Sequence, residues 1–168
     1  LRHAEVGLRR ALRAAEVSER AEKNFYLAAT VAALGRPSEA AAIYASSLSL
    51  SPQFYTAAEN MGIVLDDAKR YHEAAFAFEH AIRLEPRRAE SYSLLARSLY
   101  PLGLLTAGAS AFASAVSLAP TSASLYYELA RTDELWGTGE ARGAFGMAQR
   151  LALAQWRLNQ GSVAAELA

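Results

Sequence analysis

The sequence has no cysteine among its 168 residues, so disulfides, thiolate nucleophiles and cysteine-bound zinc are excluded. Lysine is scarce, with two residues against fifteen arginines, yet acidic and basic side chains balance at a formal net charge of zero. A neutral chain has no overall field that attracts nucleic acid or an anionic membrane, so we expect no nucleic-acid partner. No apolar run approaches the roughly 18 residues that a membrane-spanning helix requires, and we expect no direct membrane insertion.

Proline is also rare, and three of the five prolines stand 34 residues apart: Pro52, Pro86 and Pro120. Other positions repeat at the same 34-residue interval: large apolar residues, small residues and aromatic residues each recur at their own position in the unit. The three series are Leu27, Met61, Leu95 and Leu129; Ala28, Gly62, Ala96 and Ala130; and Tyr44, Phe78 and Phe112. A fixed period near 34 residues indicates stacked supersecondary units.

Each unit is predicted to contain two amphipathic helices of about 14 residues joined by a short connector. Apolar residues recur at helical spacing, for example at Ala74 and Phe78. Gly35, Gly103 and Gly137 occupy equivalent connector positions, where a residue in the left-handed conformation would end the first helix. The small residues of the first helix would let the paired helices approach closely, and the aromatic residue of the second would fill the space between them.

At these positions the chain resembles the tetratricopeptide repeats. The pattern of that family runs roughly aromatic-x2-Leu-Gly-x2-Tyr, then Ala-x3-Phe, then Pro. The third unit carries it as Tyr92, Leu95, Ala96, Leu99, Gly108, Phe112 and Pro120. The resemblance implies an all-α fold, a right-handed α-solenoid of stacked antiparallel helix pairs.

We expect a single solenoid domain with three well-formed repeats and a degenerate fourth. The fourth unit departs from the pattern because Asp133 stands where an apolar residue is expected and no proline closes the unit. Residues 1–20 are expected to form either the back half of an earlier repeat or an N-terminal capping helix. The remaining boundaries over residues 1–168 are 21–54, 55–88 and 89–122 for the three repeats, 123–158 for the fourth repeat with a capping helix, and 159–168 for a tail.

Side chains suited to catalysis are sparse. His72 and His80 lie eight residues apart on one predicted helix, too far to bind a metal together. The sequence contains no HExxH, no glycine-rich phosphate loop, no GxSxG and no EF-hand loop. We therefore expect no enzyme activity, no metal and no cofactor.

In members of the resembled family the first helix of each unit lines a concave face, and ligands usually lie there. The inward-facing residues should be those outside the packing set, at steps of four and three. The predicted groove residues are Phe25, Glu59, Asn60, Ile63, Asp66, Ser93, Arg97, Tyr100, Tyr127 and Arg131. Arginine and tyrosine are residue types that often anchor a partner.

A plainer interpretation of the same residues stays open. Tyr100 and Tyr127 would then be ordinary packing residues, and the arginines would form exposed ion pairs contributing about 0.2–1 kcal/mol. Pro101 falls late in a predicted first helix, where a proline costs about 3 kcal/mol or more. Either that helix ends a turn early or a kink reshapes the groove near Tyr100.

Repeats of this family that bind the acidic C-termini of chaperones use a clamp of two lysines, an arginine and two asparagines. Of these five only Asn60 has a counterpart here. Phe25 and Ala29 replace the first lysine and asparagine, and Glu90 and Leu94 replace the basic pair of the third unit. We therefore predict no clamp-type recognition of a free C-terminal carboxylate.

The leading hypothesis is a non-catalytic interaction module that binds a protein or peptide, as an extended peptide or a short helix, in its concave groove. One alternative is a segment of a larger enzyme that positions a substrate, favoured by a first residue that is leucine rather than methionine. Another is a self-assembling scaffold that forms a homo-oligomer.

Overall fold

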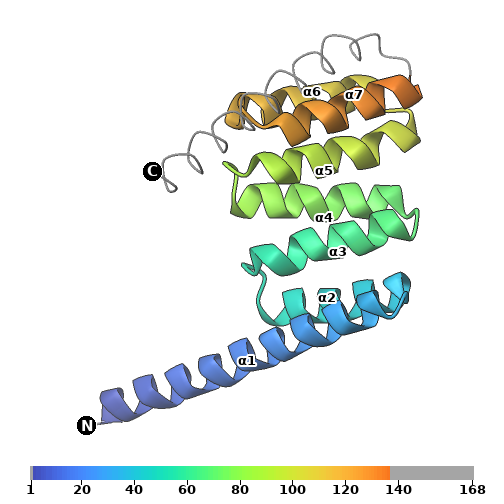
Figure 1. Ribbon diagram of the computed structural model, residues 1–168. Helices are drawn as coiled ribbons and strands as arrows, with labels where there is room; N and C mark the ends of the chain where they lie inside the picture. Colours follow the sequence, from blue (N-terminus) through green and yellow to red (C-terminus); the bar gives the residue numbers. More distant parts are fainter. Residues whose placement is uncertain (1, 137–168) are drawn as a thin grey trace, which may run out of the picture. The chain divides into compact units, whose positions relative to one another are not determined.

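The computed structural model describes the backbone of residues 2–136 and the side chains of residues 16–129. All regular structure in that range is helical, which confirms the predicted all-α class. The helices are α1 (Arg2–Ala33), α2 (Pro37–Leu50), α3 (Tyr55–Asp67), α4 (Tyr71–Leu84), α5 (Ala89–Leu99), the 3₁₀ turn η1 (Tyr100–Leu102), α6 (Leu105–Leu118) and α7 (Ala123–Trp136) (Figure 1). The capping helix predicted before residue 158 lies outside the described residues.

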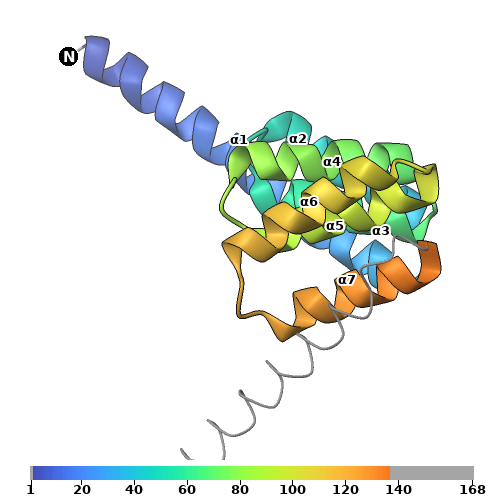
Figure 2. The same cartoon turned by 90° about the horizontal axis from the view of Figure 1, so that it is seen from above.

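The chain divides into two compact units, Leu1–Pro86 (unit 1) and Arg87–Ala168 (unit 2). In unit 1, α1 packs on α2, α2 on α3 and α3 on α4; in unit 2, α5 packs on α6 and α7 contacts both (Figures 1 and 2). The pairs α1–α2, α3–α4 and α5–α6 are antiparallel hairpins of the kind from which an α-solenoid is built. The division between the units falls close to the predicted border of repeats 2 and 3.

Helix α1 is much longer than a repeat helix, with 32 residues. The boundary predicted after residue 20 is not a helix end. Ser18 stands one step of 34 before Pro52, and without a proline there nothing stops the helix. The N-terminal part of α1 therefore extends away from the rest of unit 1 (Figures 1 and 2), and residues 16–20 are all exposed.

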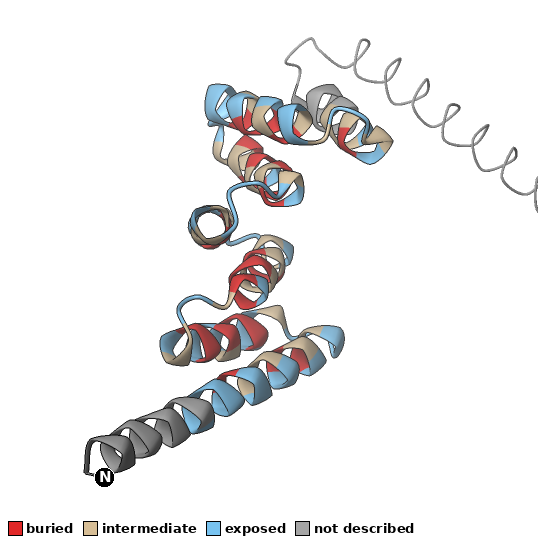
Figure 3. Cartoon of the chain, turned by 90° about the vertical axis from the view of Figure 1, so that its left-hand side faces the viewer, coloured by how far each residue is buried: buried red, intermediate tan, exposed pale blue. Residues whose placement is uncertain are grey.

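Helices α3 and α4 interlock through a small residue on the first helix and an aromatic ring on the second. Gly62 on α3 faces Phe78 on α4 so closely that a Cβ atom at Gly62 would lie 2.5 Å from the ring. The equivalent residues of the other pairs are also buried, namely Ala28, Tyr44, Ala96 and Phe112. Figure 3 marks buried positions in red on the helices of both units. The predicted close approach is confirmed.

Three connectors end their first helices in the same way. Gly35, Lys69 and Gly103 adopt left-handed φ angles of 75°, 60° and 74°. The N–H of each donates to the carbonyl three residues earlier, and the next N–H along the chain donates to the carbonyl five residues before it. These two bonds satisfy carbonyls that the helix end leaves without partners. The left-handed prediction is confirmed for both described glycines, and Gly137 lies outside the described residues.

Replacing Lys69 with glycine is expected to stabilise the fold by about 1 kcal/mol. A left-handed residue with a Cβ atom costs roughly 1–2 kcal/mol, and the greater freedom of glycine in the unfolded chain offsets only part of that gain. Urea denaturation of Lys69→Gly beside Asp67→Gly, which places glycine in the last turn of α3, would measure the difference. A Lys69→Gly chain no more stable than the natural one would contradict the expectation.

Pro101 explains why α5 is short. The helix ends at Leu99, and Pro101 stands in the first turn of η1, where its missing N–H leaves no bond unmade. Of the two predicted outcomes the early helix end is correct.

Candidate functional site

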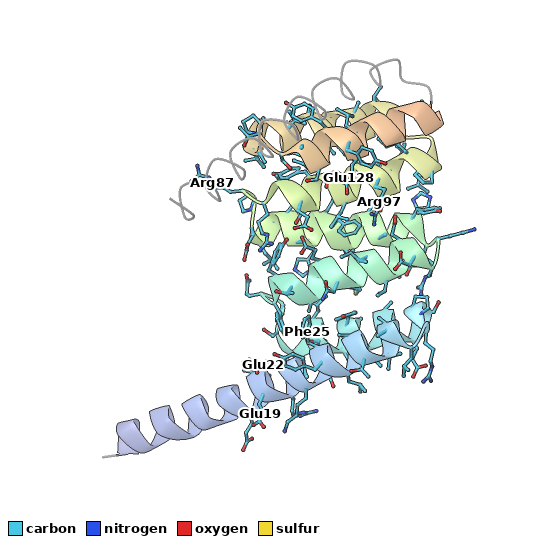
Figure 4. The ribbon with its side chains drawn as sticks, in the orientation of Figure 1. Glu19, Glu22, Phe25, Arg87, Arg97 and Glu128 are labelled. Atoms are coloured by element: carbon cyan, nitrogen blue, oxygen red, sulfur yellow. The ribbon has the colours of Figure 1, made fainter. Side chains whose placement is uncertain are left out.

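One predicted groove residue of unit 1, Phe25, lies on α1. Its ring centroid is 5.0 Å from that of Phe54 and 5.7 Å from that of Tyr44. Phe54 belongs to the connector between α2 and α3, so Phe25 (labelled in Figure 4) bridges α1 and that connector. The side chain is half-buried and keeps part of its ring open to solvent.

Glu59 on α3 is only 8% exposed. Its carboxylate accepts a hydrogen bond from the Tyr55 hydroxyl, one turn earlier on the same helix. A buried carboxylate is expensive without such a donor, so the pair makes the acidic group compatible with its surroundings. Glu59 therefore places negative charge near the surface of α3 while offering little contact area.

Three further groove residues follow on α3 at steps of three. Asn60 is half-buried and hydrogen-bonds the hydroxyl of Tyr44 on α2; burial raises the pKa of that phenol, and the bond from Asn60 partly opposes the rise. Ile63 and Asp66 are also half-buried. Residues three apart lie near one another on a helix surface, so α3 presents an amide, an aliphatic group and a carboxylate in sequence.

Unit 2 keeps two of its predicted contact residues accessible. Arg97 on α5 is exposed, and Tyr127 on α7 is 51% exposed (Arg97 is labelled in Figure 4). Ser93 is buried, and its hydroxyl donates 2.9 Å to the carbonyl of Glu90. The side chain of Arg131 lies outside those that the structure describes.

Tyr100 is not a groove residue, which corrects the prediction. Its ring is 1% exposed and lies 6.0 Å from the ring of Phe112, centroid to centroid. A Cβ atom built on Gly108 of α6 would lie 3.0 Å from the same ring. The early end of α5 turns Tyr100 into the core of unit 2, so the packing interpretation holds for this residue.

A small pocket of unit 1, the Glu22 pocket, was missed at the sequence level. Its volume is about 210 Å³, and it is lined by Ser18, Ala21, Glu22, Ser51, Gln53 and Phe54. Half of these residues lie in the turn and connector after α2, which a pattern confined to first helices does not include. One signal was present: Glu22 lies three residues before Phe25 and shares its side of α1 (Figure 4).

Unit 2 has a pocket at the same place in its repeat, the Glu90 pocket. Its volume is about 310 Å³, and Glu90, Ser93, Ser122 and Glu128 are among its lining residues. Two steps of 34 relate Glu22 to Glu90, so both pockets carry a carboxylate at one repeat position.

A second hollow of unit 1 lies between the second helices α2 and α4. It measures about 360 Å³, with Ala42 and Ala45 on one side, Phe76 on the other and Met61 beneath. Ala42 and Phe76 are equivalent by the 34-residue step, so the hollow is lined by a small residue of one repeat and a large residue of the next.

Among the described residues, no group of three or more histidine, aspartate or glutamate side chains could hold a metal ion. Within the same part of the chain, no helix combines the length and apolar character needed to cross a bilayer.

Comparison with known proteins places the fold. The family model of the tetratricopeptide repeat matches residues 55–88, the segment predicted as repeat 2. MamA from Desulfovibrio magneticus RS-1 is similar in structure, with a TM-score of 0.72, 24% sequence identity and 80% of this chain and 77% of that chain covered. Another MamA crystal structure has a TM-score of 0.73 at 20% identity, covering 82% and 81%.

The first tetratricopeptide domain of Spaghetti (RPAP3), bound to an HSP90 peptide, is also similar. Its TM-score is 0.65 at 16% identity, with 72% of this chain and 96% of that chain covered. No curated protein sequence matches the chain at a significant level. At these identities the structural similarity shows the fold.

Proposed function

The chain is a tetratricopeptide-repeat protein, and from that premise we propose that it is a non-catalytic interaction module that holds an extended peptide or a short helix on its first helices. The exposure pattern of those helices carries the proposal. Packing residues such as Gly62 and Ala96 are buried, while Ile63, Arg97 and Tyr127 stay partly or largely accessible. A domain of similar fold in Spaghetti is bound to a peptide, which supports the same use of the fold here.

The two units would contribute different chemistry to the partner. In unit 1, Phe25 and Ile63 supply apolar contact. Asn60, Glu59 and Asp66 add polar and negatively charged groups. In unit 2, Tyr127 supplies contact area, and Arg97 and Arg131 hold acidic side chains of the partner.

An affinity capture from native lysate tests the proposal, with partners read by mass spectrometry. The natural chain is compared with Arg97→Glu/Tyr127→Ala/Arg131→Glu, and a control, Arg83→Glu/Arg87→Glu, makes the same charge change at exposed positions outside the predicted groove. We expect a partner that the natural chain and the control retain and the groove variant loses, with helical content unchanged. A partner kept equally by all three would contradict the proposal.

We expect amidation of the C-terminus of a captured partner peptide to change its affinity by less than about twofold. Clamp positions here carry Phe25, Glu90 and Leu94, which give a carboxylate no positive charge, and Leu94 is buried. Calorimetric titration of the free-acid and amidated peptides would measure the ratio. A tenfold loss on amidation would show that the chain binds free C-termini after all.

A further inference from the structure

We propose that the Glu22 pocket of unit 1 binds an arginine side chain of the partner, which makes the binding surface of unit 1 selective for a cation. The inference rests on the proposed function, because it names a residue type within the same partner. It also sets unit 1 apart from unit 2, whose arginines suit acidic side chains.

The charge of the pocket points to a cation. Glu22 is the only charged residue among the six that line it. Among the described residues no cation lies within ion-pair distance of its carboxylate, since the neighbouring Lys23 pairs with Glu19 at 2.8 Å instead. The Glu22 carboxylate is therefore available to form an ion pair with a positively charged group of the partner.

The aromatic wall favours a guanidinium over an ammonium. Phe54 lines the pocket and is half-buried, and the Phe25 ring lies beside it with 34° between the ring planes. A guanidinium stacks on such a face and pairs with a carboxylate through two parallel N–H bonds. Its other N–H groups can reach oxygen acceptors on Ser51 and Gln53, which also line the pocket.

The size of the pocket suits a single side chain. Pockets for drug-sized molecules occupy about 300–1,000 Å³. The Glu22 pocket, at about 210 Å³, is smaller. Phe54 of its wall packs against the predicted groove residue Phe25, so an arginine held there would belong to the same partner chain that contacts Phe25.

The equivalent pocket of unit 2 provides an internal comparison. The Glu90 pocket has two carboxylates, Glu90 and Glu128, but it has Ser122 in place of Phe54, and Arg88 lies 3.9 Å from the Glu90 carboxylate. Without an aromatic face, the Glu90 pocket should distinguish a guanidinium from other cations less strongly. The arginine-selective site is therefore assigned to unit 1.

The test is a nuclear magnetic resonance titration of the ¹⁵N-labelled full chain with N-acetyl-L-arginine methylamide. N-acetyl-L-citrulline methylamide, which has nearly the same shape and no charge, is the control probe. With the arginine probe we expect saturable chemical-shift changes at the amides of Glu22, Gln53 and Phe54. The citrulline probe should bind at least about fivefold more weakly. Equal shifts with both probes, or shifts that gather elsewhere, would overturn the inference.

Two variants of α1 sharpen the result. Glu22→Gln should weaken arginine binding about fivefold, whereas Glu19→Gln, which removes a paired carboxylate outside the pocket, should leave it unchanged. Both positions are exposed, so neither variant should unfold the chain. Equal binding by Glu22→Gln and the natural chain would refute the assignment.

The probe needs no natural partner, so its failure is separable from that of the proposed function. Loss of a captured partner by the unit 2 groove variant, together with no arginine binding, overturns the cation site alone. Capture that is insensitive to the groove variant overturns the proposed function and leaves an arginine site in unit 1 standing.

Discussion

Replacing Phe78 with alanine is expected to lower the free energy of unfolding by about 3–5 kcal/mol. The ring is 0% exposed and fills the space over Gly62, so its removal takes apolar surface from the core and leaves a cavity between α3 and α4. Chemical denaturation would measure the loss. Phe76→Ala is the matched control, because that ring is on the same helix and 64% exposed, and its loss should cost less than about 1 kcal/mol. Similar costs for the two variants would mean that the α3–α4 interface is not packed as described.

The contact between Gly62 and Phe78 can also be tested by substituting the glycine. Gly62→Ala should destabilise the chain by about 1–3 kcal/mol, although alanine is the better helix former, because its Cβ would overlap the Phe78 ring. In the Phe78→Ala background the added methyl group has room, and the substitution should become neutral or stabilising. A double-mutant cycle measures this coupling directly. Additive effects would show that the two residues do not touch.

The packing of the helix pairs was predictable because the relevant residues are complementary in volume and repeat on one step. Gly62 with Phe78 and Ala96 with Phe112 pair a small residue with an aromatic one at fixed separation, so the sequence alone indicates which surfaces meet. Lys69 could be placed in the left-handed conformation by the same logic, since it stands 34 residues after Gly35. The position of a residue within the repeat predicts its backbone conformation here better than the local conformational propensity of that residue type does.

The candidate site was harder to predict, because it depends on backbone details that differ between repeats. A step pattern assumes regular first helices, and Pro101 breaks that assumption by ending α5 early and turning Tyr100 inward. The step pattern also leaves out residues of the connectors. Phe54, which lies outside any helix, lines the Glu22 pocket. Surface contacts follow from such local departures, whereas the core follows from the repeat.

The sequence pattern assigns both Tyr100 and Tyr127 to the groove, but their replacement by alanine should have very different effects on stability. Tyr100→Ala is expected to cost about 3–5 kcal/mol of stability, because its ring packs against Phe112 and over Gly108 in the core of unit 2. Tyr127→Ala should cost less than about 1 kcal/mol, since half of that side chain is already in water. Thermal and urea unfolding of the two variants would measure both values.

The two substitutions should rank in the opposite order in their effect on partner binding, when binding is compared between folded chains. At a temperature where both variants are folded, Tyr127→Ala should weaken capture of the partner, because an accessible tyrosine loses its contact area on truncation. Tyr100→Ala should retain the partner to the extent that it stays folded, because its ring is too deeply buried to touch one. If Tyr100→Ala lost the partner while its helical content and unfolding midpoint stayed at natural values, the ring would have to turn outward in the bound state. The assignment of Tyr100 to the core would then be wrong for the complex.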